Sequence, residues 1–227
     1  MSTPLSLRAK AYESFRQQIL EANIRPGQFI SQRELVQLLD MPLGAVRELI
    51  PRLEAEGLLK TVPQRGLQIA HVDLALINNA FQLRLVLERE AAVRFCASVS
   101  DTDLAAIEDA HRRIIERAQK GPIDETLLTD AQTVDWGLHD LMIDALNNAL
   151  ISEMYRVNSL RVRLIRLERA MLSEDALLPA MEEHLWFIEA LKRRDAPQVA
   201  IRLTHHIESA HRRVLGLPRP PLPTDTA

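Results

Sequence analysis

Residues 27–69 read GQFISQRELVQLLDMPLGAVRELIPRLEAEGLLKTVPQRGLQI, and this stretch decides the fold of the N-terminal part of the chain. Two short amphipathic runs, residues 32–39 and 43–56, lie on either side of a Met-Pro-Leu-Gly turn. Gly57 stops the second run, and two short β-like runs follow around Gln64-Arg65-Gly66. Helix, tight turn, helix and hairpin in this order predict a winged helix-turn-helix, a motif whose second helix lies in the DNA major groove.

Local signals place the ends of these helices. Ser31 is a good N-cap residue and Glu34 follows three residues later, so a capping box should start the first helix of the motif at Gln32. Pro42 can occupy the first turn of the next helix, where its missing N–H costs nothing. Pro51 lies inside that helix and removes a hydrogen bond, so we expect a kink or a shortened last turn. Upstream, residues 8–21 predict a short helix with one buried face.

The composition is that of a globular, mainly helical protein. Of the 227 residues, 47% are hydrophobic, 26% are charged and only 4% are aromatic. The single cysteine, Cys96, excludes an intramolecular disulfide and fits a reducing compartment. We find no signal peptide and no uncharged apolar stretch long enough to span a bilayer, so we expect a soluble, cytoplasmic protein without a membrane partner.

Charge is distributed unevenly along the chain, whose formal net charge is -3. Residues 1–72 carry nine Lys/Arg against seven Asp/Glu, which leaves +2 there and -5 on residues 73–227. A mildly basic N-terminal part on an acidic remainder suits a DNA-binding domain attached to a domain with another task.

The remainder of the chain predicts an antiparallel bundle of about six helices. Their expected ranges are residues 74–98, 102–120, 126–147, 150–172, 177–194 and 197–215. The fold class is therefore mainly α, with a winged helix-turn-helix domain at 1–72, a helical domain at 73–216 and a Pro-rich disordered tail at 217–227. Helical bundles build ligand sites from side chains on facing helices.

Four polar residues lie on apolar helix faces that should be buried. Asp135 and His139 are four residues apart and point the same way, while His184 and His206 lie on the stripes of two later helices. Each could be a core residue bonded to a neighbour. Together, one carboxylate and three imidazoles make a ligand set for zinc or a similar divalent ion. We interpret His71, His111 and His211 as surface or boundary residues.

The N-terminal motifs resemble those of the GntR family of bacterial transcription regulators. The resemblance rests on Gln32-Arg33-Glu34-Leu35, Val46-Arg47-Glu48-Leu49, Arg52-Leu53-Glu54-Ala55-Glu56-Gly57-Leu58 and Gln64-Arg65-Gly66, over roughly residues 8–70. It implies DNA contacts by residues in the motif and its wing, which are Arg33, Gly44, Arg47, Arg65 and Gly66. The chain departs from the family at Leu43, where the family has an arginine that contacts DNA.

The helical part resembles the effector-binding (FCD) domain of the FadR subfamily of GntR regulators. Asp135-x3-His139, Glu183-His184-Leu185 and His206 carry this resemblance, and six helices are similar to the VanR-like branch. It implies Asp135, His139, His184 and His206 as metal ligands, with zinc, nickel or manganese as the ion. It also implies a homodimer and a small carboxylate metabolite that completes the metal shell.

Two further residues lie on the buried stripe of the helix expected at 74–98, namely Arg84 and Glu88. They could form an internal ion pair, or Arg84 could clamp an effector carboxylate. Arg156, Arg161 and Arg163 are alternative clamps. Asn147 could line the effector pocket or simply end its helix.

Three functions are compatible with these patterns. The first is a repressor that binds an inverted-repeat operator as a dimer and is controlled by the metabolite. The second is a metal-dependent helical-bundle enzyme, but no extra general base or nucleophile lies on the polar stripes, and the N-terminal motif would be unexplained. The third is a partner-binding protein with an inert core. We predict the regulator, and no enzymatic activity.

Overall fold

The computed structural model describes residues 6–169 and 174–221. The chain divides into two compact units: Met1–Ile77 with Val157–Arg169 form the first, and Asn78–Arg156 with Ala170–Ala227 form the second. The described residues are mostly helical, with one small antiparallel sheet in the first unit, so the predicted fold class is confirmed.

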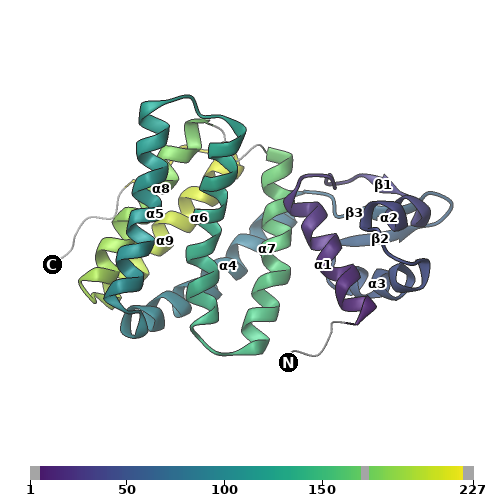
Figure 1. The fold of residues 1–227 in the computed structure, drawn as a ribbon, viewed down its shortest axis with the longest axis horizontal. Helices are drawn as coiled ribbons and strands as arrows, with labels where there is room; N and C mark the ends of the chain where they lie inside the picture. The colour runs from purple at the N-terminus through teal and green to yellow at the C-terminus, as the bar shows by residue number, and fades with distance from the viewer. Residues whose placement is uncertain (1–5, 170–173, 222–227) are drawn as a thin grey trace. The chain divides into compact units, whose positions relative to one another are not determined.

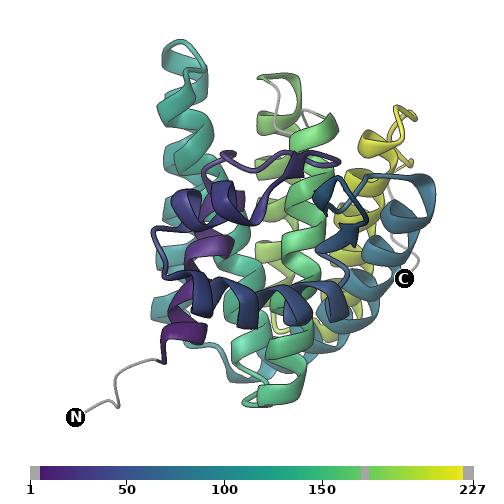
Figure 2. The same ribbon diagram turned by 90° about the vertical axis from the view of Figure 1, so that its right-hand side faces the viewer.

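The first unit contains the predicted winged helix-turn-helix (Figure 1). Its helices and strands are α1 (Leu7–Leu20), β1 (Phe29–Ile30), α2 (Gln32–Leu39), α3 (Leu43–Ala55), β2 (Leu59–Val62) and β3 (Gly66–Ile69). Figure 2 shows the short strands beside α2 and α3 from a second direction. The antiparallel sheet has the order β1-β3-β2, so the β2–β3 hairpin forms the wing. The two-residue strand β1 was not predicted.

The ends of α2 and α3 follow their local signals. The Ser31 hydroxyl accepts a hydrogen bond from the Glu34 N–H at 3.1 Å, and the Glu34 carboxylate accepts one from the Ser31 N–H at 2.7 Å. This is the predicted capping box, and α2 begins at Gln32. Helix α3 continues through Pro51 to Ala55, so the expected shortening of its last turn is wrong. Gly57 follows with a φ of +64°, a conformation that glycine adopts readily.

The second half of α7 (Ala149–Arg169) belongs to the first unit, which the sequence did not predict. Leu160 and Leu164 are buried in the core that α1, α2 and α3 share, together with Phe15 and Leu49. The Arg161 guanidinium donates a 2.6 Å hydrogen bond to the carbonyl of Glu56, the residue that ends α3. A cation at the C-terminus of a helix is favourable, because the last carbonyls lack helical partners.

The remaining helices build the second unit: α4 (Leu74–Ser98), α5 (Asp101–Lys120), α6 (Glu125–Asp144), α8 (Glu174–Lys192) and α9 (Ala196–Val214), with the first half of α7. Their ends lie within three residues of the expected positions among the residues described. Helix α8 packs against α5, α6 and α9. The buried faces of these helices form the core that surrounds the polar residues described below.

Some expectations fall outside the described residues. They are the last residues of the helix expected at 150–172 and residues 222–227 of the Pro-rich tail. Within the described ranges, every helix is too short or too polar to cross a membrane.

Candidate functional site

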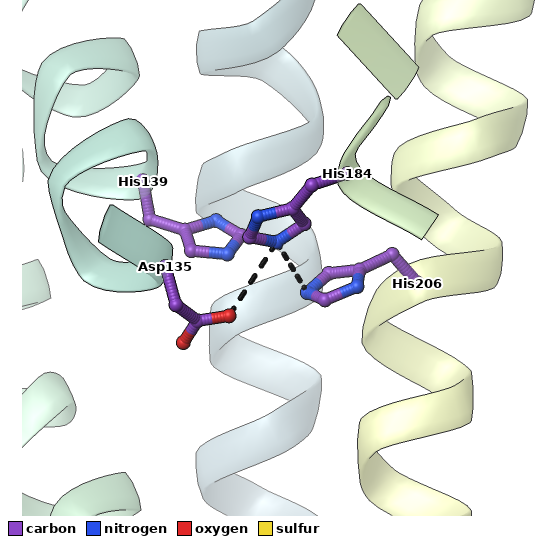
Figure 3. Close-up of side chains that lie close together, drawn as sticks. All are labelled: Asp135, His139, His184 and His206. Atoms are coloured by element: carbon purple, nitrogen blue, oxygen red, sulfur yellow. Dashed lines mark hydrogen bonds and ion pairs between the residues drawn. The ribbon is translucent and has the colours of Figure 1, made fainter. Parts of the chain in front are cut away.

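Asp135, His139, His184 and His206 converge in the second unit (Figure 3). Helix α6 supplies the first two, one turn apart, while α8 and α9 supply the other two. All four side chains are buried, with exposed fractions of 4% or less. One potential ligand atom from each lies within 4.8 Å of those of the other three. The structure therefore brings together all four residues that the sequence singled out.

The outward ring nitrogens of two of these histidines face carboxylates. His206 Nδ1 lies 3.0 Å from Glu183 Oε2, and His139 Nδ1 lies 2.7 Å from Glu88 Oε2, although the angle of the second contact falls short of a hydrogen bond. A carboxylate can only accept, so His206 Nδ1 carries the proton and its Nε2 presents a lone pair. Carboxylates in this outer position orient imidazole ligands at metal sites.

The inward nitrogens meet at the centre of the cluster. His184 Nε2 lies 3.1 Å from His206 Nε2 and 3.6 Å from Asp135 Oδ1. Burial lowers the pKa of His184 well below its usual value, and it lowers that of His206 to about 4 even though Glu183 opposes the shift. Both rings are therefore neutral near pH 7. A proton on His184 Nε2 would make this contact a hydrogen bond, and with a lone pair on each nitrogen the two would repel unless a cation lay between them.

The donor set fits a divalent metal ion. Three imidazole nitrogens and one carboxylate oxygen are the ligands that zinc and related ions take, and a buried carboxylate is costly without a partner of opposite charge. Asp135, His139, His184 and His206 would hold the ion. Glu88 and Glu183 would orient two of the imidazoles from behind.

Arg84 and Glu88 form the internal ion pair that was one of the two alternatives. Arg84 Nε donates to Glu88 Oε1 at 2.6 Å, and both side chains are buried. Burial alone would raise the pKa of Glu88, but the charges of Arg84 and His139 outweigh it and hold the pKa at about 2. Arg84 also donates to His139 Nε2 at 2.8 Å, so the pair borders the cluster. An ion pair and a ligand contact are thus compatible roles for Arg84.

The other candidates for effector binding lie elsewhere. Asn147 is exposed and lies just beyond the end of α6 at Asp144, with a φ of +49°, a left-handed conformation common after helix ends. The exposed Arg156 pairs with Asp144. Arg161 belongs to the first unit and binds Glu56, and Arg163 belongs to the same unit. Arg84 contacts the cluster directly, through its hydrogen bond to His139.

Two residues of the site had no predicted role. His111 is 1% exposed, so its interpretation as a surface or boundary residue was wrong. Its Nε2 lies 2.9 Å from His184 Nδ1. The signal was present in the sequence, because His111 shares a stripe of α5 with the buried residues Leu104 and Ile114. Glu183 precedes His184 in the sequence, but nothing local indicates that its carboxylate reaches His206.

The residues predicted to contact DNA lie on the surface of the first unit. Arg33 and Arg47 are exposed at the start of α2 and on α3. A side chain at Gly44 would meet no atom within 4 Å, so the start of α3 is open to a close approach. Arg65 is exposed in the turn between β2 and β3, with its guanidinium 3.9 Å from the centre of the Phe29 ring.

The structure gives a reason for glycine at position 66 that is independent of DNA binding. Its φ is +91°, and a Cβ there would lie 3.1 Å from the Ile30 carbonyl oxygen. Gly66 therefore allows β3 to pass close to β1 at the base of the wing, whatever it does at DNA. Leu43, which replaces the arginine of the family pattern, is 43% exposed at the first position of α3.

Family models match both parts of the chain. The model described as "Bacterial regulatory proteins, gntR family" matches residues 7–69, and the FCD domain model matches residues 79–209. The chain belongs to the GntR family of bacterial regulators, and it is of the FadR type. The four-residue cluster lies in its FCD domain.

Named relatives are transcription regulators. The transcriptional repressor RspR of Escherichia coli K12 is 25% identical over 202 residues, which cover 87% of this chain and 84% of RspR. The regulator BphR of Paraburkholderia xenovorans is 26% identical over 209 residues, covering 90% and 84%. The Nta operon regulator of Aminobacter aminovorans is 24% identical over 199 residues, covering 87% and 89%. These names indicate regulation of transcription rather than catalysis.

Solved structures share the fold. Escherichia coli McbR/YncC superposes with a TM-score of 0.79 at 17% identity, covering 94% of this chain and 99% of that protein. A GntR regulator from Rhodococcus gives a TM-score of 0.73 at 20% identity, covering 92% and 99%.

The buried histidines predict a pH dependence of stability in protein stripped of metal with a chelator. His206 has a pKa of about 4 in the folded protein, against 6.5 for a histidine in water. The unfolded chain therefore binds more protons below pH 6.5, and the free energy of unfolding should fall by about 2 kcal/mol for His206 alone between pH 7 and pH 5.

Urea denaturation at the two pH values measures this fall. His206→Gln should reduce it by that amount, whereas His71→Gln, which changes an exposed histidine, is the control. Equal pH dependence in His206→Gln and the unaltered protein would contradict the assignment.

Proposed function

We propose that this protein is a transcriptional repressor whose binding to operator DNA is controlled by a small carboxylate metabolite bound at a metal centre. The observation that carries the proposal is the convergence of Asp135, His139, His184 and His206 in a chain that also has a winged helix-turn-helix. A ligand site in one part of a chain can control DNA binding by another part when a coupling free energy links the two.

The first unit supplies the DNA contacts. Arg47 on α3 approaches base edges in the major groove, and Arg33 binds phosphate. Gly44 lets the start of α3 come close to the DNA backbone. Arg65 and Gly66 place the wing against backbone or minor groove. Leu43 offers an apolar contact where related proteins have an arginine, so the operator should differ from a family average.

The metal ion is divalent, with zinc as our first choice and nickel or manganese as alternatives. When bound, it supplies a Lewis-acidic positive centre for an oxygen ligand. Asp135 and the three histidines hold it, while the outer carboxylates keep the imidazoles in place.

Charge balance indicates an anionic metabolite. Glu88 is paired with Arg84 and Glu183 with Arg213, so each outer carboxylate already has a cationic partner. A divalent ion beside Asp135 then leaves a net positive charge in a buried site, and burying a charge without its counter-charge is costly. A carboxylate metabolite would balance it. Arg84 is the side chain placed to bind that carboxylate as well, because its guanidinium already reaches His139.

A second copy of the chain is the partner that fits the surface formed by α4 and α9. These helices border a hollow of about 780 Å³ whose lining includes Val86 and Ile201. Val86 is 63% exposed and Ile201 is 39% exposed, so two large apolar side chains face solvent in one hollow. Arg89 and Glu208 lie in the same lining and provide charges of both signs. Such a mixed surface can pair with itself about a two-fold axis, as an inverted-repeat operator requires.

In this scheme the metabolite acts by changing populations. Binding at the metal centre would favour arrangements of the DNA-binding units that do not match the half-site spacing, and repression would be relieved.

DNA binding is tested with the purified full chain and its own upstream intergenic DNA over a range of salt concentrations. Arg47→Ala should weaken specific binding about 10–100-fold, since it removes a base or phosphate contact. Arg117→Ala changes an exposed arginine of the second unit and serves as the matched control. Absence of specific binding at every salt concentration would refute the regulator.

Metal and metabolite are tested together. Elemental analysis should find about one divalent ion per chain, lost in Asp135→Ala and His206→Ala because each removes a ligand. A panel of small carboxylates should contain one that weakens DNA binding by the unaltered protein but not by His184→Ala. If the protein binds DNA but contains no metal, the proposal of a regulator is retained and the proposal of a metal centre is rejected.

The dimer is tested by sedimentation. Val86→Glu should shift the protein to monomers, because it places a charge in the apolar part of the proposed interface. Arg117→Glu places the same charge on α5, away from the hollow, and should leave the oligomeric state unchanged. A dimer that persists in Val86→Glu would move the interface to another surface.

A further inference from the structure

His111 has no assigned part in the metal centre, and it lies directly behind one ligand. His184 differs from His139 and His206, because its outward nitrogen faces a fourth imidazole, that of His111, where theirs face carboxylates. His111 reaches it from α5, a helix that supplies none of the four ligands. The contact joins His111 Nε2 to His184 Nδ1 at 2.9 Å.

The protons in this contact can be assigned from a backbone carbonyl. His111 Nδ1 lies 2.7 Å from the carbonyl oxygen of Ile107, one helical turn earlier. A carbonyl oxygen only accepts, so His111 Nδ1 carries a proton. His111 Nε2 faces His184 Nδ1 at 2.9 Å, and in an imidazole with its proton on Nδ1 this second nitrogen has a lone pair. That lone pair can accept the proton of His184 Nδ1, and this tautomer leaves His184 Nε2 bare for an ion.

We infer that His111 is a positioning residue for the metal centre: through the Ile107 carbonyl it fixes the tautomer of His184 that presents Nε2 to the ion. The inference rests on the proposed metal centre. Without the acceptor at position 111, His184 could place its proton on either nitrogen, and the tautomer with a proton on Nε2 binds no ion there. His184 Nδ1–H would also lose its partner in a buried place.

The chain of hydrogen bonds from the Ile107 carbonyl through His111 to His184 also explains why a histidine suits position 111. An acceptor is needed 2.9 Å from His184 Nδ1, and the same side chain must satisfy its remaining proton on the carbonyl of Ile107. A neutral imidazole does both without adding a negative charge. A carboxylate there would be a further buried charge beside Glu88, Glu183 and Asp135.

Zinc affinity of the full-length protein, measured by competition with a chromophoric chelator, provides the first test. His111→Phe keeps a ring but removes the acceptor, and zinc affinity should fall about 10–100-fold, the usual effect of losing an outer partner of a metal ligand. His111→Gln restores an acceptor near the position of Nε2 and should recover most of the affinity. Ile114→Ala is the control, since it weakens the packing of the buried face of the same helix and leaves the hydrogen bonds of His111 in place.

A second readout follows the proton itself. Long-range ¹H–¹⁵N correlation of histidine-labelled, metal-free protein should show His184 with its proton on Nδ1, and His111→Phe should lose this single tautomer while Ile114→Ala keeps it. The tautomer of His184 can be read from the unaltered protein alone, so the test remains possible if His111→Phe does not fold.

The outcomes separate the two proposals. An unaltered protein that binds no zinc refutes the metal centre itself. Zinc binding that is equal in His111→Phe and the unaltered protein, or lowered as much in Ile114→Ala as in His111→Phe, overturns the role of His111. A His184 proton on Nε2 in the metal-free, unaltered protein overturns it as well.

Discussion

The constraint on which the site depends is the approach of buried imidazole lone pairs. His184 Nε2 and His206 Nε2 lie 3.1 Å apart where water does not reach them, and Asp135 lies beside them. Neutral rings that both turn a lone pair inward repel, and protonated rings would carry an expensive buried charge. A divalent cation resolves both difficulties at once. The outward contacts of the rings with Glu183, His111 and Glu88 keep the inward nitrogens turned towards the same point.

The same electrostatics links the metal centre to a ligand. The buried carboxylates Glu88 and Glu183 each have an arginine partner, so an ion at Asp135 would leave the site positive and ready for an anion. Arg84 links binding of the ion to binding of the anion, because it donates to a nitrogen of His139 that the ion would also use. A lone pair can serve only one of them. The proposed ion would therefore release an Arg84 N–H for the carboxylate of the metabolite.

Much of the architecture was predictable because its signals are local. The capping box at Ser31 and Glu34, the glycine stop at Gly57 and the apolar periodicity of the helices act within a few residues, and α2 begins and ends where expected. Strand β1 was not predicted because two residues are too few to show an alternating hydrophobic pattern. The strand forms by pairing with β3. The second half of α7 escaped for a related reason: its pattern predicts a helix, but its partners Phe15 and Leu49 are distant in the sequence.

The sequence by itself determined the family pattern, the helical faces and the four ligand types, since a polar residue on an apolar helical stripe can be recognised from residue spacing. Only the tertiary structure decided which nitrogen of each histidine faces inward. That choice depends on acceptors brought from other helices, Glu88 from α4, His111 from α5 and Glu183 from α8. A hydrogen bond requires its atoms within about 3 Å, and sequence spacing does not specify distances between helices.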